Sequence, residues 1–156
     1  MELLVIMSPE RRSQEAIHFA VAQAAEQKMS LKAVYVIEES ILKAVEKELA
    51  EIGFIGDKPG HEVSAALQKE HESRGQKVLD EISKESAKHN VSVTTEIVTG
   101  YYFRVCDELA ASSAVGAVVV IDLKKGFFKK IFSTDEIKLL ESSCHKPVYS
   151  YISEGN

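Results

Sequence analysis

The sequence predicts an α/β fold: a doubly wound, five-stranded, mostly parallel sheet with the strands in the order 3-2-1-4-5. Short apolar runs rich in β-branched residues alternate with longer segments of helical spacing, which is the pattern of βαβ units. The run 117–121 is apolar on both faces, as in a strand covered by helices on each side. Right-handed crossovers then wind the sheet in two directions. The five predicted strands are Leu3–Met7, Leu31–Ile37, Val91–Val98, Ala117–Ile121 and Val148–Ile152.

The first helix is expected to begin directly after the first strand. Ser8 suits the N-cap position, and Pro9 suits the first helical position, where its missing N–H costs nothing. Apolar residues then recur at helical spacing and predict a buried stripe. This stripe consists of Ile17, Ala20, Val21 and Ala24.

Two helices are expected between the second and third strands. The first is amphipathic and runs from Ile41 to Ile52, and the second runs from about Val63 to Lys88. Between them, residues 53–60 contain three glycines and Pro59, which predicts a loop.

The last helix is expected to begin at a capping box, Ser133–Glu136. Just before it, residues 124–132 hold four lysines and three phenylalanines. An anion site is one interpretation, with Lys129 or Lys130 assisting the free N–H groups of the helix start. A lid with its rings turned inward is another interpretation, and a patch for a partner or a membrane surface is a third.

The carboxyl ends of the strands are where doubly wound sheets bind ligands. Tyr101–Arg104 follows the third strand at this edge, where its rings either stack on a base or cap the core, and Arg104 is placed to join an anion site. The candidate residues for an anion or nucleotide at this edge are Ser8, Ile37, Arg104, Lys129, Lys130, Ser133 and Thr134.

Composition limits the classes of function. The 156 residues fit one domain, 1–156, and 19 basic against 24 acidic residues give a net charge of −5, unlike the basic surplus of nucleic-acid binders. The two cysteines lie outside any CxxC, which indicates reduced thiols, and we expect Cys144 to be buried and inert. No stretch reaches the ~18 apolar residues that span a bilayer. We expect a cytoplasmic protein, bound neither to nucleic acid nor to a membrane.

Motifs for catalysis or metal binding do not occur in the sequence. The five histidines show no HxxxH or HxH spacing, and GxSxG, Walker and GxGxxG motifs are missing. We therefore expect no metal site, no catalytic residue and no enzymatic activity.

Five segments carry a family resemblance: Leu3–Pro9, Ala33–Ile37, Glu96–Gly100, Ala117–Ile121 and Lys146–Val148. They resemble the universal stress protein family, whose architecture is flavodoxin- or Rossmann-like. The resemblance implies a five-stranded sheet, a dimer and, in one branch, an ATP site with an Asp after the first strand and a GxxG motif after the fourth. Here Ser8 and Pro9 stand at the Asp position, no GxxG follows the fourth strand, and Ser133-Thr134 takes the place of the final Gly-Ser pair. We therefore expect no cofactor, with ATP disfavoured.

The resemblance and the departures together predict a binding or regulatory module of the stress response. Two alternatives stay open: a nucleotide switch that binds ATP or AMP, and an enzyme of the adenine-nucleotide hydrolase group. The expected partners are a second copy of the chain, paired through the last strand, and an unidentified protein or small anionic ligand. In that strand Val148, Ser150 and Ile152 alternate with Tyr149 and Tyr151, so it offers two distinct faces.

Overall fold

The computed structural model describes residues 1–51, 58–123 and 129–154. Its strands form one sheet in the order β3-β2-β1-β4-β5, and every pair in it is parallel. The predicted fold class and strand order are therefore confirmed. In chain order the elements are β1 (Glu2–Met7), α1 (Gln14–Glu26), β2 (Ser30–Glu38), α2 (Glu39–Glu51), α3 (Lys58–Lys88), β3 (Val93–Gly100), α4 (Tyr102–Ala110), β4 (Val115–Asp122), α5 (Lys129–Cys144) and β5 (Val148–Ile152).

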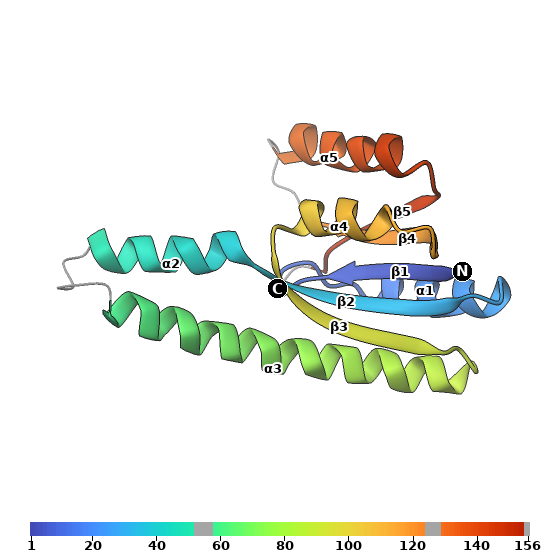
Figure 1. Ribbon diagram of the computed structural model, residues 1–156, viewed down its shortest axis with the longest axis horizontal. Helices are drawn as coiled ribbons and strands as arrows, with labels where there is room; N and C mark the ends of the chain where they lie inside the picture. The colour runs from blue at the N-terminus through green and yellow to red at the C-terminus, as the bar shows by residue number, and fades with distance from the viewer. Residues whose placement is uncertain (52–57, 124–128, 155–156) are drawn as a thin grey trace.

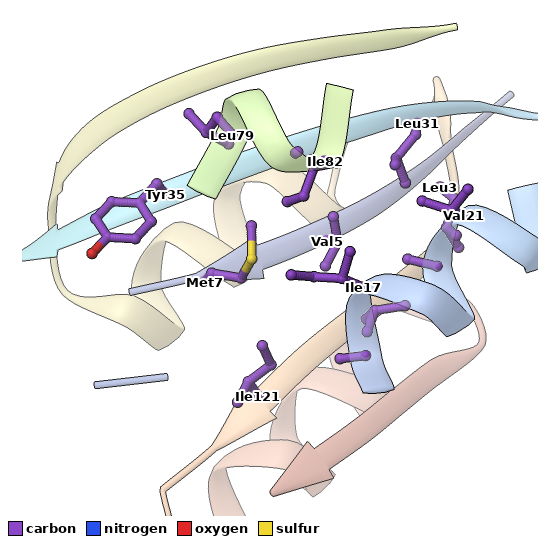
Figure 2. Close-up of a cluster of buried hydrophobic side chains, with 14 of the residues drawn as sticks. Leu3, Val5, Met7, Ile17, Val21, Leu31, Tyr35, Leu79, Ile82 and Ile121 are labelled. Carbon is purple, nitrogen blue, oxygen red and sulfur yellow. The ribbon is translucent and has the colours of Figure 1, made fainter. Parts of the chain in front are cut away.

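Helices cover both faces of the sheet (Figure 1). Successive residues of β1 point to opposite faces, so Val5 packs under α1 and α3, whereas Ile6 packs under α4 and α5. Figure 2 shows the first of these two cores, in which Ile17 of α1 and Ile82 of α3 meet the strands. Burying one such side chain contributes about 1.5–3 kcal/mol to the free energy of unfolding. The many buried side chains of the two cores together hold the strands, and therefore their ends, in place.

The start of α1 differs from the sequence prediction. The helix begins at Gln14, and Ser13 is its N-cap, with a hydroxyl that accepts a hydrogen bond from the Ala16 N–H at 3.1 Å. Ser8 instead closes a turn with Arg11, in which each backbone N–H donates to the other residue's carbonyl at 3.1 Å. The prediction that Ser8 caps the helix was wrong because its hydroxyl is used locally, accepting from the Arg11 N–H at 3.2 Å. The predicted buried stripe of the helix is confirmed.

Helices α2 and α3 lie side by side and extend beyond the carboxyl ends of the strands (Figure 1). Helix α3 begins at Lys58, so the predicted loop ends earlier than Gly60, and residues 52–57 lie outside the described part. At its middle, α3 approaches β2 closely. A Cβ added at Gly75 would lie only 2.5 Å from a ring carbon of the buried Tyr35.

Helix α5 begins at Lys129, four residues before the predicted start. Ser133 therefore lies within the helix rather than at its N-cap, and the prediction of a capping box at the helix terminus was wrong. The preceding residues 129–132 contain neither glycine nor proline, so nothing in them opposes helical backbone. The inner face is as expected at Leu140, which is 1% exposed. Cys144 at the end of the helix is half-buried rather than buried.

Candidate functional site

The strand order reverses between β1 and β4, and this is the place where the fold can form a ligand crevice. The paired residues of the two strands run as far as Val5 and Val119. Beyond them, the hydroxyl of Tyr102 bridges the strands: it donates to the Ile6 carbonyl at 2.6 Å and accepts from the Ile121 N–H at 2.8 Å. Tyr102 is 2% exposed. Its side chain therefore occupies the space between the two strand ends.

Arg11 closes the same place from the loop between β1 and α1. Arg11 is 8% exposed, and its Nη1 donates a hydrogen bond to the Ile121 carbonyl at 3.1 Å. The guanidinium carbon lies 4.4 Å from the ring centroid of Tyr102 and 5.0 Å from that of Phe103. Weak hydration and a flat shape suit a guanidinium to such a buried, stacked position.

Two carboxylates balance the charge of Arg11. The Nε atom lies 3.5 Å from Oε1 of Glu38, and Nη1 lies 3.7 Å from Oδ1 of Asp122. All three side chains are nearly buried, with exposed fractions of 9% for Arg11, 11% for Glu38 and 5% for Asp122. We call Arg11, Glu38, Tyr102 and Asp122 the crevice cluster.

The electrostatics of the crevice cluster follow from its burial. Burial raises the pKa of Glu38, although the charge and hydrogen bond of Arg11 and a hydrogen bond with Ser8 act in the opposite direction. Burial also raises the pKa of Tyr102 well above its usual value, so the phenol stays protonated and able to donate to Ile6. The cluster is internally satisfied and holds no activated nucleophile. Burial also raises the pKa of the thiol of Cys106, which is buried against Tyr102.

The structure separates the residues that were predicted for the site. Ser8 is buried at the end of β1, next to the crevice cluster. Ile37 is 1% exposed and packs in the core under α1 and α3, so it faces no ligand. Arg104 is exposed on α4 and stacks on Tyr101, with 5.1 Å between the guanidinium carbon and the ring centroid. Tyr102 caps the core, as one of the two interpretations had it.

The remaining predicted residues belong to α5. The backbone of Lys129, Lys130, Ser133 and Thr134 is helical, and their side chains lie outside the described part of the structure. Residues 124–128 also lie outside it. The three interpretations of the basic-aromatic segment 124–132 therefore stay predictions.

Arg11 is the central residue that the sequence prediction missed. The sequence prediction placed a helix start at Ser8 and Pro9 and assigned no role to Arg11. A usable signal was the position of Glu38 and Asp122, because each directly follows a predicted parallel strand, so the two carboxylates share one edge of the sheet. Two carboxylates at a buried edge need a cation nearby.

No group of three or more His, Cys, Asp or Glu side chains in the described ranges is placed to hold a metal ion. Within the same ranges, no helix is long and apolar enough to cross a membrane.

The sequence and the fold of this chain were compared with those of known proteins. No family model and no curated protein matches the sequence. Solved structures do match over almost the whole chain. The universal stress protein UspA from Lactobacillus plantarum has a TM-score of 0.70 at 14% identity, with 99% of this chain and 97% of that chain covered. The chain has the universal stress protein fold.

Two further structures agree with this result. The hypothetical protein MJ0577 has a TM-score of 0.72 at 15% identity and covers 99% of this chain and 97% of its own. A universal stress protein in complex with cAMP has a TM-score of 0.61 at 12% identity, with coverage of 97% and 98%. At these identities the likeness concerns the fold, and the predicted resemblance to universal stress proteins is confirmed at that level.

Proposed function

We propose that this chain is a binding and regulatory module of the stress response that works without family-type ATP binding. The observation that carries the proposal is the crevice cluster. The guanidinium of Arg11 and the ring of Tyr102 fill the position between β1 and β4 where doubly wound folds receive a ligand. A nucleotide would have to displace a buried cation that is bound to two carboxylates. The proposal also holds that the protein is cytoplasmic, has no cofactor and is not an enzyme. Burial raises the pKa of the Cys106 thiol, which disfavours the thiolate form that a nucleophile requires.

Titration with ATP and GTP tests this function. We expect affinities no better than about millimolar, with no preference for adenine and a marked decrease as ionic strength rises. The physical reason is that exposed cations give attraction without a shaped base pocket. Calorimetry at low and high salt measures both properties. Arg104→Gln is the informative variant, because Arg104 is the exposed cation on α4, and we expect it to weaken ATP binding by less than about twofold, the small effect of one exposed charge.

The same titration can also contradict the proposed function. Micromolar, adenine-selective binding that survives high salt would reject the proposal in favour of the nucleotide switch, for which the cAMP complex of a protein with the same fold is the nearest precedent. Adenine-selective binding weakened by more than about twofold in Arg104→Gln would place that nucleotide beside Arg104.

We further propose that the module is a homodimer paired through β5. This strand is an edge of the sheet, with β4 as its neighbour, and Ile152 on it is 63% exposed. An unpaired edge leaves backbone donors and acceptors open, and pairing with a second β5 across a two-fold axis satisfies them.

The dimer is tested by Ile152→Glu. We expect sedimentation velocity at micromolar concentration to give a dimer for the wild type and a monomer for this variant, because the introduced charge would be buried against its twin. The matched control is Leu139→Glu on α5, which alters a side chain that is 68% exposed but does not belong to the strand. A monomeric wild type, or equal dissociation by the control variant, would refute pairing through β5.

A further inference from the structure

A second recess lies on the opposite face of the sheet from α4, between the first turn of α1 and the middle of α3. The cleft has a volume of about 460 Å³, within the range of small-molecule sites. Its apolar lining is Ile17 and Val78. Three basic side chains surround this lining: Arg12 beside α1, and Arg74 and Lys77 on α3.

Two carboxylates also line this cleft, Glu81 on α3 and Glu154, and Glu154 lies at the start of α1. Oε1 of Glu154, which follows β5, accepts a hydrogen bond from the backbone N–H of Gln14 at 2.8 Å. The N–H groups at a helix start have no partner within the helix, and the helix dipole favours negative charge there. The backbone N–H of Glu154 also donates to the Arg12 carbonyl at 2.8 Å. A carboxylate of the chain thus marks the position where an anion is stabilised.

Buried polar groups next to the basic residues are an independent observation. His71 is nine-tenths buried, one turn before Arg74 on α3, and its Nδ1 has no hydrogen-bond partner among the described residues. Burial lowers the pKa of His71, and the charge of Arg74 acts in the same direction. A buried ring nitrogen without a partner is an unsatisfied polar group in α3, one turn from a basic residue of the cleft.

Tyr35 is a second such group. Burial raises the pKa of its hydroxyl, and the charges of Arg12 and Arg74, two basic residues of the cleft, both oppose the rise. Its ring packs against Gly75, beside Arg74. In Figure 2 the hydroxyl points away from the hydrophobic cluster. The polar end of this buried side chain is therefore directed out of the core.

We propose that the cleft between α1 and α3 binds a small phosphorylated molecule, whose phosphate is held by Arg12, Arg74 and Lys77 and displaces the carboxylate of Glu154. A phosphate suits the site better than a carboxylate because it carries up to two charges and three acceptor oxygens, which match three cations and a helix N–H. The site is separate from the crevice cluster, so this inference goes beyond the proposed function and does not depend on it.

Titration of ¹⁵N-labelled protein with pyrophosphate tests the proposal by NMR. We expect the Gln14 amide resonance to shift and saturate. Arg74→Gln should weaken the affinity at least about tenfold, which is the effect of one charge-assisted hydrogen bond. Lys84→Gln is the matched control: it removes the same charge from an exposed position of α3 outside the cleft, and we expect a change of less than about twofold. Glu154→Gln should bind pyrophosphate several-fold more tightly, because the competing charge is gone.

The same titration can overturn the proposal. Equal losses from Arg74→Gln and Lys84→Gln would mean that pyrophosphate senses the general charge of α3 and has no site. An unmoved Gln14 resonance in both the wild type and Glu154→Gln would exclude binding at α1. Failure of the proposed function can be distinguished from failure of this proposal. A nucleotide in the crevice would shift the resonances of Arg11 and Tyr102 and leave the Gln14 amide resonance unchanged.

Discussion

Replacing Arg11 with methionine is expected to lower the free energy of unfolding by about 3–5 kcal/mol, the usual cost of removing one partner from a buried ion pair. The substitution keeps most of the volume but leaves the carboxylates of Glu38 and Asp122 without their cation in a nearly buried site. Urea unfolding followed by circular dichroism gives the difference. The control is Arg104→Met, which removes an exposed guanidinium that also stacks on a ring, and which should cost no more than about 1 kcal/mol.

The loss caused by Arg11→Met should depend on pH. Burial raises the pKa of Glu38 in the folded protein, and loss of Arg11 removes the charge that opposes this rise. A carboxyl group whose pKa is higher in the folded state binds more protons there, so stability falls as pH rises from the ordinary value of 4.5 through the raised value. We therefore expect a larger loss at pH 7 than at pH 4.5. A loss equal to that of Arg104→Met at both pH values would show that the crevice carries no buried ion pair.

Tyr102→Phe is expected to cost about 2–4 kcal/mol, although it removes a single oxygen atom. That oxygen satisfies the Ile6 carbonyl and the Ile121 N–H at once, and both backbone groups lie on buried strands that do not pair with each other at this point. Neither group has water to replace the lost partner. Thermal and urea unfolding measure the loss.

Tyr149→Phe provides the matched comparison for Tyr102. Tyr149 is half-buried, packs its ring against Phe19 with 4.9 Å between centroids, and makes no side-chain hydrogen bond with any described residue. Its substitution should change the free energy of unfolding by less than about 0.5 kcal/mol. If both variants lost the same small amount, the bridge between β1 and β4 would contribute nothing to stability.

The fold was predictable because it depends on patterns that are local in the sequence. Apolar runs such as Val118–Ile121 reflect burial on both faces of the sheet, and the alternation of strands with helical segments determines the parallel order. Helix starts were predicted less well. Ser8 and Ser133 both have the chemistry of an N-cap, but the first closes a turn with Arg11 and the second lies inside α5.

The site was less predictable because it is assembled from distant parts of the chain. Ser8 follows a strand whose position comes from the topology, so its place beside the crevice could be inferred, while its role toward a ligand stays a prediction. The place of Arg11 could not be inferred, because the carbonyl to which it donates belongs to Ile121, 110 residues further on. Its role depends on side-chain direction in a loop, which periodicity does not encode. Glu154 illustrates the same limit, since its partner Gln14 is 140 residues earlier.

These long separations have a consequence for synthesis on the ribosome. Arg11 is translated early, and Glu38 follows soon after, but the β4 residues Ile121 and Asp122 appear only when most of the chain has been made. Until then the central strand β1 has no neighbour on one side, and the side of it that will face β4 is unpaired. Non-local contacts of this kind form only after the intervening loop has been closed. The nascent protein therefore acquires its native sheet late in translation. For most of that time Arg11 lacks its β4 partners, and the edge of β1 that pairs with β4 is unpaired.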